Sequence, residues 1–544
     1  MLARQIRHEL VSLLRTPITL ILSIGLPLLF FVLLSALVGN EVVDPATGVR
    51  LVQYLAPGMA AFGVVMATFS FLAVGLAEAR ANGVVKRQAG APVPRWVLVG
   101  GRVGAALVLG LTATTLIVLA GVLFYDLVVP GRSVVPIVVS LLLASACFSA
   151  LGLALALALP TMQLTLAVTN GIVIPLAFVS DMFLVGTQLP PVLSTIGWLF
   201  PLRHLTALMS HALAPYAAGT GFAADHLAVL GLWGLLGAAV ATAMLRRGTD
   251  RASTRGRAAR YGAGARAHRQ DAVSRRAGSP STAALILDQV RHAQAALWRD
   301  ASAVFFAVAF PVVLVVVIPS VNGGGDQLLA GGQALGVFYA GTMAVYGAAV
   351  TAYVNTPQSF AEDRDRGVLK RSGGTPLPAA ELLAGRVVGA LSVAVVTGVA
   401  IAVLAAVSYR PAWPPGLPAA LVSLVLATVC FAVVGLAVTT FVRSAQAVVG
   451  VTLGTLLPLA FVSDIFVVGA TLPAGLEWLS WFFPLRHATA AVTEALAPAA
   501  TGTGLAWGHL LVLLAWTTVG AAVLAVRFRW DAKESAQTAR SSSR

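Results

Sequence analysis

The sequence predicts an all-α integral membrane protein in which twelve transmembrane helices form two parallel six-helix repeats. Three observations lead to this fold class. Only 10% of the 544 residues are charged and 58% are hydrophobic, with a mean hydropathy of +0.88, whereas soluble globular proteins carry roughly 25% charged residues. Long apolar segments recur along the chain. The second half of the chain also repeats motifs of the first half at a nearly constant distance.

The net charge of +15 indicates membrane topology rather than nucleic-acid binding. Nucleic-acid-binding domains carry Lys and Arg on a solvated fold, whereas the basic residues of this chain separate apolar segments. The two cysteines, Cys147 and Cys430, lie inside apolar segments, which excludes a disulfide scaffold. We therefore expect contact with membrane lipid and no nucleic-acid partner.

The apolar segments account for the predicted spans one by one. A bilayer core about 30 Å thick requires about 20 apolar residues in a helix, and Pro160 and Gln163 divide the longest segment into two spans. The first repeat has spans within residues 18–38, 51–77, 103–125, 133–180 (two spans) and 227–245. The second repeat has spans within residues 301–320, 333–361, 387–409, 418–442, 444–463 and 510–526. The first segment is too long for a signal peptide, so we expect a transmembrane helix there.

Lys and Arg residues set the orientation of the spans, because cytoplasmic loops of membrane proteins are enriched in them. With the amino terminus inside, only five of the 36 Lys and Arg residues fall outside, namely Arg50, Arg132, Arg203, Arg410 and Arg486. The sequence therefore predicts a multi-pass protein of a bacterial plasma (inner) membrane with both termini in the cytoplasm.

A duplication organises the chain. The segment PLAFVSD at residues 175–181 recurs at 458–464, and FPLRH at 200–204 recurs at 483–487, each displaced by 283 residues. Because each copy has an even number of spans, both copies share one orientation. The predicted domains are a first six-span repeat, an Arg-rich cytoplasmic linker, a second six-span repeat and a cytoplasmic tail, at residues 1–245, 246–282, 283–530 and 531–544. The linker is interpreted as a topology anchor near anionic lipid, and a specific docking role stays open.

Each repeat begins with an amphipathic segment. In RQIRHELVSLLRTP, Ile6, Leu10 and Leu13 follow near-helical spacing beside basic residues, which is typical of a helix that lies on the membrane surface. The segment recurs in the second repeat, so we expect an interfacial elbow helix before each first span. The basic residues of the two elbow helices are Arg7, Arg15, Arg291 and Arg299.

The longest cytoplasmic loop inside each repeat follows the second span. It reads AEARANGVVKR from residue 77 and AEDRDRGVLKR from residue 361. We interpret the alternating acids and bases as a surface that pairs with charges of another protein, rather than as a merely solvated loop. The candidate contact residues are Glu78, Arg80, Gly83, Lys86, Arg87, Glu362, Asp363, Arg364, Asp365, Arg366, Gly367, Lys370 and Arg371.

A Pro-interrupted apolar stretch precedes the last span of each repeat and predicts a re-entrant hairpin at the outer face, shielded by protein. Its candidate residues are Asp181, Arg203, His204, Asp464, Arg486 and His487. Intramembrane charges are functional hypotheses by default, so these residues are candidates for an outer gate. An Asp–Arg pair that only ties the hairpin down is the other interpretation.

The sequence contains no catalytic, cofactor or metal motif. The three lysines, Lys86, Lys370 and Lys533, are followed by Arg, Arg and Glu, so no G-x-x-x-x-G-K-[ST] phosphate loop occurs. No H-E-x-x-H zinc motif occurs either, and the histidines are scattered. We expect a transport subunit without its own ATP site, cofactor or metal.

The elbow helix, the six spans, the loop after span two and the outer L-P…P-L-x-H hairpin resemble the permease subunit of type-2 ABC exporters, including drug and antibiotic exporters of the daunorubicin type. The loop match rests on Glu362, Arg364, Gly367, Thr375 and Pro376, with Glu78, Arg80 and Gly83 as a degenerate first copy in which Ala91-Pro92 replaces Thr-Pro. In this family a half-permease usually dimerises, and here two halves are fused in one chain. The resemblance implies a separate cytoplasmic ATPase, in two copies, that binds ATP and Mg and receives the loop and the elbow helix.

Two alternatives belong to other classes. An ion-coupled secondary transporter of the major facilitator type also has two parallel six-span halves and a basic central loop, but the long loop, the elbows and the hairpins weigh against it. A non-transporting membrane scaffold is the third class. The Ala, Val, Gly and Arg usage is typical of a high-GC bacterium, where the expected function is efflux of an amphipathic drug, an antibiotic or a lipid-like substrate.

Overall fold

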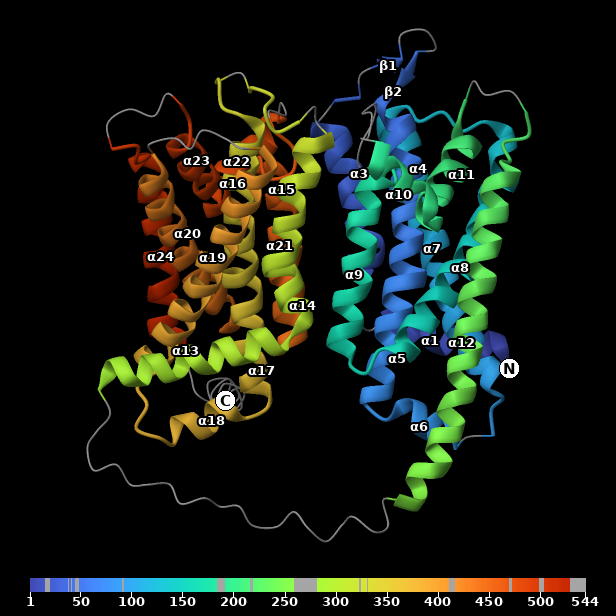
Figure 1. Cartoon of the computed structure of the whole chain (residues 1–544), viewed down its shortest axis with the longest axis horizontal. Helices are drawn as coiled ribbons and strands as arrows, with labels where there is room; N and C mark the ends of the chain where they lie inside the picture. Colours follow the sequence, from blue (N-terminus) through green and yellow to red (C-terminus); the bar gives the residue numbers. More distant parts are fainter. Residues whose placement is uncertain are drawn as a thin grey trace, which may run out of the picture.

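The computed structural model describes residues 1–14, 20–37, 39–40, 42–44, 48–90, 92–182, 191–215, 219–258, 281–321, 324–329, 331–409, 416–468, 472–498 and 503–528. Arg15 of the first elbow, residues 183–190 of the first outer hairpin, most of the linker and the predicted tail lie outside these ranges. Two groups of long helices stand side by side, one for each sequence repeat (Figure 1).

The first repeat is helical apart from one pair of short strands. Its elements are α1 (Leu2–Leu14), α3 (Leu26–Leu37), β1 (Val42–Asp44), β2 (Val49–Arg50), α4 (Leu51–Val65), α5 (Leu72–Ala81), α6 (Val84–Ala89), α7 (Arg95–Tyr125), α8 (Val134–Ala158), α9 (Met162–Val179), α10 (Pro191–Leu199), α11 (Pro201–Leu213) and α12 (Ala224–Ala258). A 3₁₀ turn, Gly131–Ser133, leads into α8.

The second repeat follows the same order of helices. Its elements are α13 (Thr282–Arg299), α14 (Ala301–Val304), α15 (Phe310–Val321), α16 (Leu335–Ala349), α17 (Thr356–Asp365), α18 (Val368–Gly373), α19 (Ala379–Tyr409), α20 (Leu417–Thr439), α21 (Ala445–Val462), α22 (Ala474–Phe482), α23 (Pro484–Ala495) and α24 (Trp507–Arg527). Helices α13 and α1 therefore occupy the two positions at which the sequence predicts elbows.

Within the described ranges, eleven helices are long and apolar enough to cross a membrane, and each coincides with a span predicted from the sequence. The prediction of a helical multi-pass membrane protein is confirmed. The segment predicted at residues 18–38 contains a shorter apolar helix, Ser23–Ala36, so the exact number of twelve stays a prediction. The all-α description needs one correction, because β1 and β2 pair as antiparallel strands where valines favour extended backbone.

Local sequence signals explain where the fifth span of each repeat begins. Thr161 Oγ1 accepts a hydrogen bond from Leu164 N (3.2 Å) at the start of α9, and Ser444 Oγ accepts one from Ala447 N (3.2 Å) at the start of α21. A side-chain cap of this kind satisfies an amide at the helix start. The division of the longest apolar segment near Pro160 is therefore confirmed, since α8 ends at Ala158.

The repeat extends to irregularities of the backbone. The segment Met66–Phe71 is π-helical within the second span, and so is its counterpart Val350–Asn355. A second matched pair, Ile21–Gly25 and Phe305–Ala309, lies in the first span of each repeat. Each pair is displaced by 284 residues, so the duplication is visible in conformation as well as in sequence.

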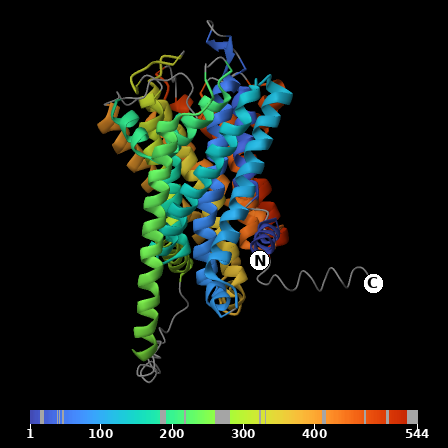
Figure 2. The same cartoon turned by 90° about the vertical axis from the view of Figure 1, so that its right-hand side faces the viewer.

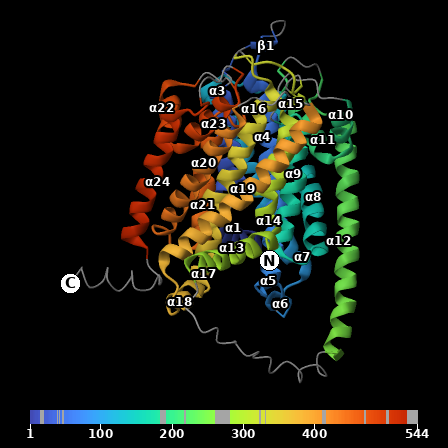
Figure 3. The same cartoon turned by 60° about the vertical axis from the view of Figure 1, so that its left-hand side comes forward.

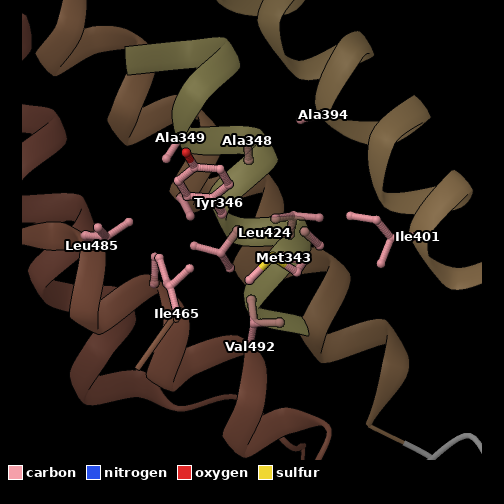
Figure 4. Close-up of a cluster of buried hydrophobic side chains, with 14 of the residues drawn as sticks. Met343, Tyr346, Ala348, Ala349, Ala394, Ile401, Leu424, Ile465, Leu485 and Val492 are labelled. Carbon is pink, nitrogen blue, oxygen red and sulfur yellow. The ribbon is translucent and has the colours of Figure 1, made fainter. Parts of the chain in front are cut away.

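The core of each repeat surrounds its second span. Nearly every residue of helix α16 is buried, and Met343 and Tyr346 pack among Leu424, Ile465 and Val492 from neighbouring segments (Figure 4). The corresponding cluster of the first repeat is built around α4. The second span is therefore the central, protein-enclosed helix of each half.

The two repeats meet along a seam of fifth and first spans. Helix α9 lies against α14, and α21 lies against α3. Aromatic side chains line this contact: the ring centroids of Phe30 and Phe461 are 4.6 Å apart, those of Phe461 and Phe466 are 4.9 Å apart, and those of Phe466 and Tyr346 are 5.2 Å apart. The seam thus joins the two cores through apolar contacts.

The last span of the first repeat is longer than its counterpart. Helix α12 continues through Arg246 to Ala258, and it projects beyond the other helices at the end that carries α6 and α18 (Figures 1 and 2). The first part of the predicted linker is thus helical, and residues 259–280 lie outside the described ranges.

Candidate functional site

The loop after the second span forms a helical corner in both repeats. Helix α17 is followed by Gly367 with φ +72° and then by α18, while α5 is followed by Gly83 with φ +69° and then by α6. Glycine adopts this left-handed conformation without the steric cost of a Cβ atom. Both corners lie at the end of the molecule opposite the strands β1 and β2 (Figures 1 and 3).

Asp363, a candidate partner contact, points into the protein. Its Oδ2 atom lies 2.5 Å from Arg386 Nη2 of α19, and the two side chains are 12% and 3% exposed. Arg386 Nη1 also donates to Ser359 Oγ (3.3 Å). His292 Nε2 of the elbow α13 lies 3.6 Å from the same oxygen of Asp363. This ion pair therefore connects the second span, the third span and the elbow.

The first repeat neutralises the equivalent arginine in a different way. Ala79 stands at the position of Asp363, and Arg102 is the counterpart of Arg386. Arg102 Nε lies 3.6 Å from Glu9 Oε1 of the elbow α1. The second repeat has Ala293 at the position of Glu9. The acidic partner thus comes from the elbow in one half and from the second span in the other.

Two further candidate residues tie the corner to the junction of the fourth and fifth spans. Arg364 Nη1 donates to the carbonyl of Thr439 at the end of α20 (2.7 Å), and Asp365 Oδ2 accepts a hydrogen bond from Ala445 N at the start of α21 (3.0 Å). Arg80 of the first repeat donates in the same way to the carbonyl of Ala156. Charge-assisted bonds of this kind are strong, so the corner and this junction are held together.

The charges that remain on the outer surface of the corners are mainly basic. Lys86 and Arg87 on α6 and Lys370 and Arg371 on α18 are exposed. Glu362 is half-exposed and pairs with Arg366 one helical turn away (3.0 Å), and Glu78 is half-exposed. The structure thus brings the candidate loop residues together, but some of them bond to other parts of the protein, while the exposed ones are mainly basic.

Each elbow packs tightly on a third span. A Cβ atom on Gly101 of α7 would lie 2.3 Å from Gln5 Cγ of α1, and one on Gly385 of α19 would lie 2.3 Å from Gln289 Cβ of α13. Glycine at these two positions therefore permits the close approach of the elbow. The elbow arginines Arg7, Arg291 and Arg299 are exposed.

The outer hairpins contain the predicted Asp–Arg pairs. Asp181 Oδ2 lies 2.7 Å from Arg203 Nη2, and Asp464 Oδ2 lies 3.3 Å from Arg486 Nη2. Both aspartates have positive φ, near 57°. Burial raises the pKa of the Asp181 carboxyl, and the Arg203 guanidinium opposes this effect. Each pair closes the turn between the fifth span and the hairpin.

A contact between an arginine and a tryptophan also stabilises each hairpin. The Arg203 guanidinium carbon lies 4.5 Å from the ring centroid of Trp198, and that of Arg486 lies 4.5 Å from the ring centroid of Trp481. Cation–π contacts of this kind stabilise an arginine in a desolvated setting. The geometry agrees with the interpretation that the ion pairs fasten the hairpin.

The sequence did not predict that His204 and His487 each pair with a second histidine. His204 Nδ1 lies 3.0 Å from His226 Nδ1, and His487 Nδ1 lies 2.9 Å from His509 Nδ1. His226 and His509 are 283 residues apart, so a comparison of the repeats contains the signal that finds them. His509 Nε2 also lies 3.2 Å from Glu494 Oε1. No group of three or more His, Cys, Asp or Glu side chains in the described ranges is arranged to hold a metal ion.

A family comparison identifies the class of protein. The family model for ABC-2 type transporters matches residues 3–213 and again residues 290–497. The chain belongs to this family of membrane permeases, and each sequence repeat accounts for one match. A comparison with curated proteins found no match.

Proposed function

We propose that the chain is the transmembrane permease of an ATP-driven exporter, with two half-permeases fused in one chain, and moves an amphipathic drug, antibiotic or lipid-like substrate out of a bacterial cell. Twelve spans in two six-span repeats, with both elbows and both termini at the cytoplasmic face of the plasma membrane, form the permease. A separate cytoplasmic ATPase in two copies binds ATP and Mg and supplies the energy.

The observation that carries this proposal is the pair of matching helical corners. Helices α6 and α18 occupy equivalent positions at one end of the molecule, and each exposes a Lys-Arg pair. Two equivalent basic surfaces suit an ATPase that binds as a dimer with complementary charge. Each corner is also hydrogen-bonded to the fourth span through Arg80 or Arg364. A movement of the ATPase would therefore be transmitted through the corners to the spans.

The proposed substrate class follows from the seam. Phe30, Phe461 and Phe466 lie between the two cores. A substrate that passes between the halves would meet these apolar aromatic side chains, which suit apolar or amphipathic molecules. The outer hairpins lie at the opposite end from the ATPase and form the proposed gate. The major facilitator alternative is not favoured, because both repeats match the ABC-2 family model.

The purified chain should hydrolyse no ATP alone and should form a stable complex with an ATP-binding subunit of the same cell. Hydrolysis is measured for the chain, for the ATPase and for the mixture, and complex formation by size-exclusion chromatography. Hydrolysis by the isolated chain, or a failure to associate with any ATP-binding subunit of the same cell, would falsify the proposal.

The β1–β2 hairpin should face outward, and the end of α12 should face the cytoplasm. In a Cys147→Ala, Cys430→Ala background, a single cysteine at Asp44 should react with an impermeant maleimide in intact cells, whereas one at Ser253 should react only after lysis. The reverse labelling pattern would invalidate the proposed orientation.

A further inference from the structure

A cavity of about 360 Å³ lies between the elbow α13, the second span and the third span of the second repeat. Ligand pockets typically enclose roughly 300–1,000 Å³. Gln163 of α9 also lines the cavity, so the first repeat contributes to its wall. Helix α13 lies across the ends of the spans (Figure 1). In the orientation proposed above, on which this inference rests, the cavity is therefore at the level of the lipid headgroups of the cytoplasmic leaflet.

One buried donor in this wall has no acceptor among the described residues. Arg386 is 2% exposed, and its Nη1 and Nη2 atoms are bonded to Ser359 and Asp363, but its Nε atom is unpartnered. A buried donor without an acceptor destabilises the protein. A ligand oxygen in the cavity would satisfy it.

In the first repeat, a carboxylate oxygen of the protein itself lies at the equivalent position. There the equivalent Nε atom, on Arg102, faces the Glu9 carboxylate at 3.6 Å. Ala293 replaces this glutamate in the second repeat and lines the cavity. The absence of a carboxylate at position 293 therefore leaves the Arg386 Nε atom without the acid that its counterpart has in the first repeat.

We propose that this cavity binds a zwitterionic phospholipid of the cytoplasmic leaflet, with its phosphate oxygen in the place that Glu9 occupies in the first repeat. Arg386 Nε and Arg299 at the exposed rim are the phosphate donors. This site is independent of the ATPase surfaces on α6 and α18.

The charge and polarity of the wall favour this ligand. Three cationic side chains, Arg299, Arg366 and Arg386, are balanced by three acidic ones, Asp300, Glu362 and Asp363. A free phosphate dianion would disturb this balance, whereas a zwitterionic headgroup preserves it. Leu297, Ala390 and Val393 add an apolar wall for the glycerol and the first acyl carbons.

Substitution Ala293→Glu should weaken lipid binding, because the new carboxylate takes the place proposed for the phosphate and pairs with Arg386. The full chain is reconstituted in nanodiscs of a phosphate-free glycosyl diacylglycerol and titrated with phosphatidylethanolamine, and bound lipid is counted by native mass spectrometry. We expect one saturable site in the wild type and an affinity lowered about tenfold or more in Ala293→Glu. Glu9→Ala is the matched control and should retain the wild-type site.

Arg299→Gln is a second test that does not depend on the fold of the Ala293→Glu variant, since Arg299 is exposed. It should weaken the binding of phosphatidylethanolamine several-fold. Equal binding by the wild type and both variants would overturn the proposal. Displacement of the lipid by millimolar inorganic phosphate would also overturn it, because the site would then take free phosphate rather than lipid.

Discussion

Substitution Asp363→Ala should destabilise the chain by about 3–5 kcal/mol, since it leaves the buried Arg386 guanidinium without its carboxylate partner. Arg386 is only 2% exposed, and Asp363 is the acid in direct contact with it. Ser359 offers only a neutral hydroxyl. The measurement is thermal or denaturant unfolding of the purified chain in detergent, together with the yield of inserted protein.

The first repeat provides a matched control and a rescue. Glu9→Ala removes the corresponding acid from Arg102, but this pair is 3.6 Å apart and more exposed, so we expect a loss of only about 1 kcal/mol or less. The double variant Asp363→Ala, Ala293→Glu reproduces the arrangement of the first repeat and should recover most of the lost stability. Equal loss in the single and double variants would contradict this explanation of the asymmetry.

Reversal of the exposed basic pairs should strongly weaken the complex with the ATPase while leaving membrane insertion intact. The variant combines Lys86→Glu, Arg87→Glu, Lys370→Glu and Arg371→Glu. One exposed ion pair contributes only about 0.2–1 kcal/mol, so single changes should be tolerated. Four reversals together convert attraction into repulsion, and about 1.4 kcal/mol already lowers affinity tenfold. Co-purification of the ATPase and its measured dissociation constant report the effect.

Arg50→Glu serves as the control for this reversal. Arg50 is also exposed and basic, with a side chain 48% exposed, but it lies in β2 at the opposite end of the molecule. It should leave ATPase binding unchanged. Undiminished binding by the fourfold variant would remove α6 and α18 from the coupling role.

The sequence was sufficient to predict the spans and the duplication, because both depend on local composition and spacing. The division near Pro160 depends on a polar, turn-forming segment followed by the capping Thr161, and the structure confirms it. The Asp181–Arg203 contact could also be expected, since both residues recur together in the second hairpin at the same separation.

The direction of each charge on the loop after span two could not be read from the sequence. Glu362 and Asp363 are neighbours, yet about 100° of helical rotation separates them, and one pairs on the surface while the other is buried against Arg386. Which of them turns inward depends on a contact between helices. The His204–His226 pair escaped prediction for the same reason, because its two residues come from different helices.

A measurement of the driving force of transport distinguishes an ATP-driven exporter from an ion-coupled transporter. The chain is reconstituted with its ATPase in proteoliposomes, and export of a fluorescent amphipathic dye is followed with and without ATP and Mg, and with and without an imposed proton gradient. We expect transport that requires ATP hydrolysis, persists without a gradient and is lost when the basic pairs on α6 and α18 are reversed. Transport driven by the gradient alone, without ATP or the ATPase, would contradict this expectation.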